Sequence, residues 1–433
     1  MPNRLDTSSA NFEAEFGALL AAKREVASSV DDVVAAILDD VRTRGDGAVL
    51  DYTKKFDGLD IGAADMRVTG QEFDAAEKAT PDEQLTALRA AGARITAYHT
   101  RQMPNGDLYA DEAGVQLGYR WTAISSVGVY TPGGKAAYPS SVLMTAIPAK
   151  VAGVDRLVMT VPAPGGLLNP LVLVAARQAG IDEVYKIGGA QAVAALAYGT
   201  QSIPAVNKIA GPGNAYVAAA KRQVFGVTGI DMEAGPSEIL VVADGQNNPE
   251  WIAADLLSQA EHDESAQAIL ITDDGKFASA VIASVDQILE TLGRSAIAGK
   301  SWADHGVVIV VGNLDEAPPL VDRIAPEHLE LAVADPDGMA AKIRNAGAIF
   351  LGRFTPEAIG DYIAGPSHVL PTGRSPRFAS GLSVFDFLKR TSMVRCDEDS
   401  IRAVGPHAVT LAEAEGLGAH AQSVKLRLGT SGS

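Results

Sequence analysis

The chain has 433 residues, too many for one hydrophobic core, so we expect two or three domains. Hydrophobic residues make up 47 % of it, which excludes a disordered chain. The formal net charge of −17 argues against nucleic acid as a partner, because phosphate binding needs a basic face. No apolar run reaches the roughly 20 residues of a membrane span. The single cysteine, Cys396, fits a reducing compartment, and we expect a cytoplasmic protein that does not bind membranes.

The first part of the chain, residues 12–105, is predicted to be mostly helical. The run from Asp31 to Val41 has apolar residues at helical spacing and acidic residues in its first turn. A second helical pattern begins at Pro81. We therefore assign residues 1–110 to a helical N-terminal segment, which could pack on the second of two α/β domains.

A pattern of strand, glycine-rich turn and helix begins near Tyr119 and then repeats. Strand-like segments at 126–130, 157–161 and 183–187 alternate with helical ones. Repeated units of this length predict a parallel sheet with helices on both faces. We assign residues 111–236 to this first Rossmann-like α/β domain, and we expect its ligands at the carboxyl ends of the strands.

Two glycine turns in this domain allow backbone to approach a ligand closely. They are Gly188-Gly189 and Gly211-Pro212-Gly213, and the helix N-termini that follow them suit a pyrophosphate. Neither turn carries the GxGxxG fingerprint. The turn from Thr131 to Lys135 also fails as a phosphate-binding Walker A loop, because Ala136 follows the lysine. On spacing alone, nucleotide binding and ordinary tight turns are about equally supported.

A second, similar α/β domain is predicted over residues 237–375. Its expected strands are 237–244, 268–272, 306–311, 329–333 and 348–351. Its expected helices are one from Trp251 with His262 in its last turn, followed by 275–292, 314–324, 336–345 and 356–364. The stretch from Pro371 to Pro376 is predicted to be an exposed link. Residues 376–433 then form a small C-terminal unit that we expect to be helical.

Histidines and carboxylates gather at the ends of the predicted elements. Gln259 and His262 are three residues apart, which places them on one face at the end of a helix. Alone, such a pair is more typical of a polar helix end. The other sets are Glu327 with His328, Asp361 with His368, and Glu415 with His420. Together the four sets favour an acid–base or metal site, whose nitrogen and oxygen donors suit zinc better than magnesium.

Seven motifs, in chain order, resemble those of the histidinol dehydrogenase family. They cover residues 128–134, 188–192, 211–217, 234–238, 256–262, 325–329 and 368–372. The resemblance extends over essentially the whole chain. It implies a zinc- and NAD-dependent oxidation of L-histidinol to L-histidine, in two hydride transfers through histidinaldehyde. It also implies a domain-swapped homodimer.

The resemblance assigns roles to residues at the matching positions. Zinc would be held by Gln259, His262, Asp361 and His420. The substrate would be held by these four and by Ser237, His328 and Glu415. NAD would contact Tyr130, Gln191 and Asn214. Glu415 and His420 would reach the site of the partner chain.

The chemistry of this reaction calls for two bases. A histidine is available as a base near neutral pH, and we assign His328 to the alcohol step. The aldehyde step needs an adduct, and Cys396 lies among carboxylates that disfavour its thiolate. Water addition remains, with Glu327 as its base. We assign His368 a supporting role, and we expect zinc to act as a clamp on the substrate.

Other functions stay open on the residues alone. A related dehydrogenase acting on another amino or sulfonated alcohol would keep the same bases, although Glu415 and His420 complete a histidinol-type pocket. A zinc hydrolase without redox function would also use paired bases next to a nitrogen and oxygen metal site. A non-catalytic binding protein with this fold would need neither base.

Overall fold

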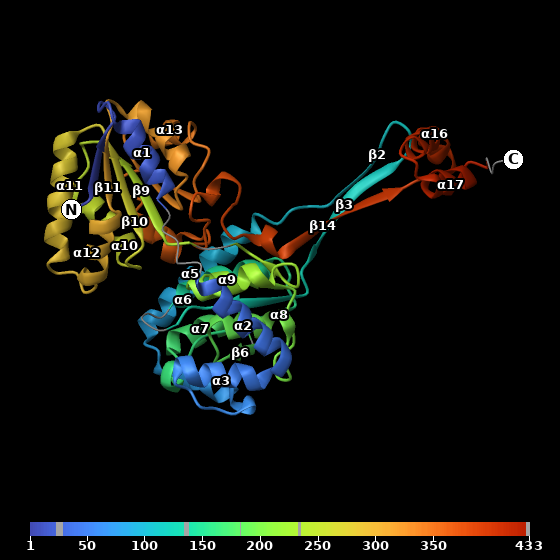
Figure 1. Ribbon diagram of the computed structural model, residues 1–433, viewed down its shortest axis with the longest axis horizontal. Coiled ribbons are helices and arrows are strands. Elements are labelled where there is room, and N and C mark those ends of the chain that lie inside the picture. The colour runs from blue at the N-terminus through green and yellow to red at the C-terminus, as the bar shows by residue number, and fades with distance from the viewer. Residues whose placement is uncertain (23–28, 134–137, 182, 233–234, 430–433) are drawn as a thin grey trace.

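The structure, a computed structural model, describes residues 1–22, 29–133, 138–181, 183–232 and 235–429 (Figure 1). Gly134 and Lys135 of the turn that begins at Thr131, the Ala136 that follows them, and Ala234 of the 234–238 motif lie outside the described residues. The described chain forms two parallel sheets, each with helices on both faces, and one antiparallel sheet. The predicted α/β class with two Rossmann-like domains is therefore confirmed.

Sheet A is six-stranded and entirely parallel. Its order is β1 (Asn3–Asp6), β11 (Val307–Val310), β10 (Gln267–Thr272), β9 (Glu238–Ala243), β12 (His328–Ala332) and β13 (Ala348–Leu351). Strand β9 is buried along its whole length, as expected for an aliphatic run covered on both faces. One face packs against α1 (Phe12–Ala21) and α13 (Ala317–Ile324), with α14 (Pro336–Ala340) beside them. The other packs against α10 (Pro249–Ala260), α11 (Gly275–Leu289) and α12 (Ser295–His305).

Sheet B is five-stranded and parallel. Its order is β6 (Glu183–Tyr185), β5 (Arg156–Thr160), β4 (Ser126–Tyr130), β7 (Lys208–Ala210) and β8 (Gly229–Ile230). One face is covered by α4 (Gly70–Ala79), α5 (Asp82–Thr100), α6 (Pro139–Val151) and α7 (Pro170–Gln178). The other is covered by α2 (Ser29–Arg44), α3 (Asp46–Asp57), α8 (Gly189–Tyr198) and α9 (Ala215–Val224).

A slender arm projects away from both sheets (Figure 1). It consists of β2 (Asp107–Ala110), β3 (Gln116–Ala123), β14 (Leu388–Arg395), α16 (Glu398–Ala414) and α17 (Gly418–Arg427). Strand β3 pairs antiparallel with both β2 and β14. The C-terminal unit was expected to be helical, but it begins with the strand β14, because β3 supplies an edge for it to pair with.

Two further elements differ from the sequence-based expectations. Strand β1 was not predicted, and it extends sheet A by pairing in parallel with β11. Helix α12 was also not predicted, although its Ala298 and Trp302 are buried in the sheet A core. Within the described part of the chain, no helix combines the length and the apolar character that crossing a membrane requires.

Candidate active site

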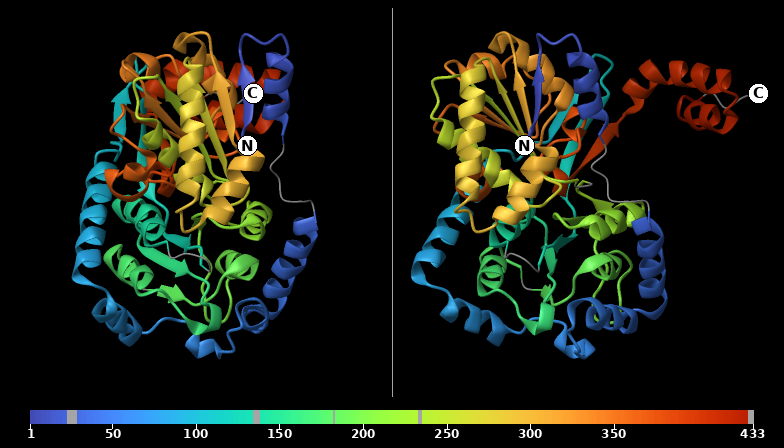
Figure 2. Two further views of the ribbon diagram at one scale, coloured as in Figure 1. Left: turned by 90° about the vertical axis from the view of Figure 1, so that its left-hand side faces the viewer. Right: turned by 60° about the vertical axis from the view of Figure 1, so that its left-hand side comes forward.

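The candidate site lies where the amino edge of sheet A faces the carboxyl edge of sheet B. Figure 2 shows the sheet A half above the sheet B half. Ser141, in the first turn of α6 above sheet B, lies with its Oγ 3.0 Å from Nε2 of His368, which belongs to the sheet A half. Ligands of the first α/β domain were expected at the carboxyl ends of its strands. In the second domain the Glu327–His328 pair lies at the opposite, amino edge, because it stands at the junction from α13 to β12 and His328 is the first residue of β12.

The pair is held in place by the turn from α13 into β12. Ala325 ends α13 in the left-handed conformation, with φ 51°, and redirects the chain so that β12 starts three residues later. Glu238, the first residue of β9, fixes both side chains. Its N–H donates to Glu327 Oε2 at 2.8 Å, and its carbonyl lies 3.0 Å from His328 Nδ1. With Nδ1 engaged in this way, Nε2 of His328 remains buried without a hydrogen-bond partner.

Three carboxylates surround the His328 ring. Nδ1 is 3.7 Å from Glu327 Oε2, and Nε2 is 3.8 Å from Glu357 Oε1 and 3.7 Å from Asp361 Oδ1. Burial lowers the pKa of His328, but these carboxylates, Glu327 first, outweigh it and raise the pKa to about 10. Burial raises the pKa of Glu327 to about 8. Burial alone would raise the pKa of Asp361. The cationic neighbour His328 and the nearby histidines outweigh burial and lower this pKa to about 2, so Asp361 is ionised at neutral pH.

The other predicted zinc ligands of this half lie around the same point. Gln259 is buried in the last turn of α10, and its Oε1 has no hydrogen-bond partner. His262 lies two residues beyond the end of α10, and its N–H donates to the Gln259 carbonyl at 3.1 Å. Partial desolvation lowers the pKa of His262, and Asp361 opposes that shift. His368 keeps its Nδ1 3.1 Å from the Asp361 carbonyl, which fits the supporting role assigned to it.

The structure does not bring all predicted site residues together within one chain. Ser237, directly before β9, is at the amino edge, next to the Glu327–His328 pair. Glu415 and His420 are exposed at the end of α16 and in α17, at the far end of the arm (Figure 1).

One buried residue of the site, Glu357, was not predicted from the sequence. It is buried, its Oε2 accepts a hydrogen bond from Ser258 at 2.8 Å, and burial raises its pKa to about 7. Glu357, His328 and Asp361 each offer one donor atom, and these atoms lie within 4.8 Å of one another. Its position four residues before Asp361 is the signal that could have revealed it, because such residues share a helix face.

The predicted NAD residues lie at the carboxyl edge of sheet B. Tyr130 ends β4, and its hydroxyl accepts a hydrogen bond from the N–H of Gly189 at 3.0 Å. Gln191 is buried in the first turn of α8 with Oε1 unpartnered, and Asn214 caps the N-terminus of α9. Two threonines of this edge that the sequence did not single out, Thr131 and Thr160, also have buried hydroxyls without partners. Several unpartnered polar atoms at one sheet edge favour a polar ligand there.

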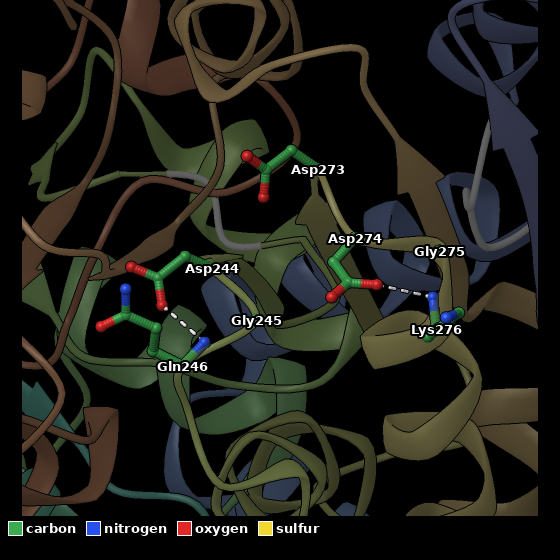
Figure 3. Close-up of a pocket in the computed structure, with 7 residues that line it drawn as sticks. All are labelled: Asp244, Gly245, Gln246, Asp273, Asp274, Gly275 and Lys276. Atoms are coloured by element: carbon green, nitrogen blue, oxygen red, sulfur yellow. Dashed lines mark hydrogen bonds between the residues drawn. The ribbon is translucent and has the colours of Figure 1, made fainter.

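A wide hollow at the opposite, carboxyl edge of sheet A is not a comparable site. Figure 3 shows that its Asp244 and Asp274 carboxylates bond to the backbone N–H groups of Gln246 and Lys276, at 3.0 and 2.7 Å. Asp244 also pairs with Arg353. These two acidic side chains thus serve their own turns and a salt bridge.

Comparisons with known proteins agree on one family. The family model described as histidinol dehydrogenase matches residues 20–428. The chain is 63 % identical over 429 residues to the histidinol dehydrogenase of Rhodospirillum rubrum, covering 99 % of both chains. It is 62 % identical over 426 residues to that of Rhizobium meliloti, covering 98 % of both. The crystal structure of the Elizabethkingia anophelis histidinol dehydrogenase superposes with a TM-score of 0.94 at 36 % identity, covering 100 % of this chain and 99 % of that one. The protein therefore belongs to the histidinol dehydrogenase family and is an NAD-dependent oxidoreductase.

Proposed function

We propose that the protein oxidises L-histidinol to L-histidine through histidinaldehyde, with two NAD+ per substrate and one zinc ion in each subunit. The observation that carries this proposal is the buried Glu327–His328 pair, which faces the carboxyl edge of sheet B with Nε2 of His328 unpartnered. The first step removes a proton and a hydride from the alcohol. The second adds water to the aldehyde and again removes a proton and a hydride.

The two bases are placed for two different proton transfers. In its neutral form His328 would accept the proton of the alcohol at Nε2, since Nδ1 is held by the Glu238 carbonyl. Glu327, beside it, is the base for the water that adds to the aldehyde. Its pKa of about 8 is close to neutral pH, which suits a group that must both take and return a proton.

The residues around the pair fit a zinc ion. Gln259 Oε1 is a buried acceptor without a donor, Asp361 is ionised, and the lowered pKa of His262 favours the neutral form that binds metal. These three residues, with His420 of the partner subunit, would hold the zinc, which when bound clamps the amine and imidazole of the substrate. A cation beside Asp361 also offsets the negative charge around His328, which moves that histidine towards the neutral form a base needs.

A domain-swapped homodimer would complete this site. The arm carries exposed apolar side chains, which are Leu108, Tyr109, Val394, Leu411, Leu417 and Leu426. The sheet A half also exposes apolar residues around β13, which are Trp251, Ile349, Leu351, Phe354 and Tyr362. Surfaces of this kind typically mark association sites. Docking of the arm on a second copy would bring Glu415 and His420 to the partner's Asp361. A cytoplasmic location stays a prediction.

Absorbance of NADH tests the proposed reaction. With limiting L-histidinol and excess NAD+, we expect two NADH per histidinol, because both oxidations occur in one site. One NADH per histidinol would indicate an alcohol dehydrogenase. No NADH would favour the alternatives of a zinc hydrolase or a non-catalytic binding protein. Zinc analysis of the purified protein is expected to find the metal, and Asp361→Asn to lose most of it.

A further inference from the structure

Asp57 has an energetically unfavourable position for a carboxylate. It is the last residue of α3, where the helix dipole disfavours negative charge, and Gly58 follows it in the left-handed conformation. Its Oδ2 is fully buried and has no hydrogen-bond partner. A buried carboxylate oxygen without a donor is costly, which calls for an explanation in terms of a ligand.

Neighbouring cations do not neutralise Asp57. The two lysines in the last turn of α3 are used elsewhere, since Lys54 pairs with Asp60 at 2.6 Å and Lys55 lies over the Phe56 ring at 5.1 Å. Burial raises the pKa of Asp57, and among the described residues no cation opposes that shift. The carboxylate therefore has unused capacity to accept hydrogen bonds.

The chain after α3 carries Asp57 to the carboxyl edge of sheet B. Met66 accepts a hydrogen bond from Lys186, and Val68 donates to Val184, both at 2.8 Å, so this segment runs antiparallel to β6 and starts at its carboxyl end. Leu59 Cδ1 lies 3.4 Å from the position that a Cβ would take on Gly166, in the turn after β5. Asp57 is thus on the same edge as Tyr130 and α8.

Tyr130 provides a second link to that edge. Burial raises the pKa of Tyr130 to about 12, and the nearby Asp57 carboxylate adds to this rise. The Tyr130 hydroxyl is bonded to Gly189, at the N-terminus of α8. Gly189 has φ 66°, and a Cβ there would come within 2.7 Å of Gln191 Oε1. Asp57 therefore lies close to the turn on which a pyrophosphate would rest.

Sheet B lacks an acidic residue at the usual ribose-binding place. In parallel sheets of this order, a carboxylate after the second strand commonly accepts hydrogen bonds from the adenosine ribose. Here the second strand, β5, is followed by Val161, Pro162 and Ala163. We propose that Asp57 takes that role from outside the sheet, binding the ribose hydroxyls and making the site select NAD+ over NADP+. The inference rests on the NAD+ use in the proposed function. The 2′-phosphate of NADP+ would meet the carboxylate with like charge and without a hydroxyl donor.

Titration of the whole protein with NAD+ and with NADP+, followed by calorimetry, tests this inference. The variant is Asp57→Asn, and the matched control is Asp60→Asn, which removes an exposed carboxylate three residues later. We expect Asp57→Asn to weaken NAD+ binding by about tenfold or more, while NADP+ binding is unchanged or stronger. Asp60→Asn should leave both affinities and their ratio unchanged. Thermal unfolding should show Asp57→Asn to be at least as stable as the parent, because the buried unpaired charge is gone.

The outcomes separate this inference from the proposed function. An unchanged ratio of NAD+ to NADP+ affinity in Asp57→Asn, including an equal loss of both, overturns the ribose role while histidinol oxidation stands. A parent protein that binds NAD+ but forms no NADH with L-histidinol overturns the proposed function alone. A parent that binds neither dinucleotide overturns both.

Discussion

Glu327 and His328 are adjacent in sequence but are expected to serve different steps. His328→Asn should slow oxidation of L-histidinol by about 100-fold or more, because the alcohol proton loses its acceptor. Glu327→Gln should slow mainly oxidation of histidinaldehyde, since the water loses its base. Rates measured with each substrate separately check this division.

Two outcomes of these rate measurements would contradict the proposed division of roles between Glu327 and His328. Equal losses on both substrates in both variants would mean that the pair acts as one unit. Unchanged rates in both would remove the pair from the chemistry.

Glu330, two residues after His328, is expected to make the free energy of unfolding depend on pH. Burial raises its pKa well above the ordinary carboxyl value, and burial raises the pKa of its neighbour Asp255 to about 6. As pH rises above about 4.3, the unfolded chain loses the Glu330 proton while the folded chain keeps it. The free energy of unfolding therefore falls with increasing pH.

Glu330→Gln should remove this dependence. The amide oxygen can still accept the bond from the Glu357 N–H, now made at 2.5 Å, and the amide nitrogen can donate to Asp255. At pH 8 we expect the variant to be more stable than the parent, and at pH 5 we expect a smaller difference, because the folded and unfolded chains differ less in Glu330 protonation there. Urea unfolding at both values checks this. The exposed Glu83→Gln should change neither, and a loss of stability in Glu330→Gln at pH 8 would refute the account.

Among single residues, the sequence pointed to side chains with distinctive chemistry. Gln259, His262, Glu327, His328 and Asp361 lie around the amino edge of sheet A, and their roles stay predictions. Glu357 was missed because a glutamate in an amphipathic stretch resembles a solvated one. Only the packing of its segment under α10, with Ser258 against its carboxylate, makes it a buried acid.

Among the elements, strand β1 shows how tertiary pairing overrides local pattern. Its four residues include one buried apolar side chain, Leu5, which is too little for a periodicity to detect. The edge of β11 supplies the hydrogen-bond partners that make this short segment a strand. The aliphatic strands β9 and β10, by contrast, were predictable because continuous apolar runs in the sequence indicate buried strands.

Leu5→Ala is therefore expected to destabilise the sheet A half. Loss of a buried leucine side chain should lower the free energy of unfolding by about 2–4 kcal/mol. Leu167→Ala is the matched control, because Leu167 is 81 % exposed. Urea unfolding of both variants checks the difference, and a change of less than about 0.5 kcal/mol in Leu5→Ala would show that β1 contributes no core packing.

Across the whole molecule, the placement of Glu415 and His420 on the arm makes the proposed dimer testable by mixing. His420→Asn and His262→Asn should each be inactive alone. In a mixed dimer, one site receives both changes and the other receives neither. Random reassociation should then restore about a quarter of the parent activity, because half of the dimers are mixed and each has one intact site.

Size-exclusion chromatography of each variant provides the control, since both must remain dimeric. No recovery after unfolding and refolding the two variants together would place His420 outside the partner's site. The sequence could not predict the arm itself, because β3 is only half-buried, β14 is largely exposed, and the two strands lie far apart in the chain.

The pairing of β3 with β14 also determines at which stage of biosynthesis the arm can form. Gln116 pairs with Arg395, so the two strands meet only when nearly all of the chain has left the ribosome. The strands of sheet B end at Ile230, but the core on one of its faces also includes Leu382, Val384 and Phe387, so this core too is completed only late in synthesis. The proposed exchange of arms between two copies would therefore be a post-translational event, and its rate would depend on the concentration of finished chains.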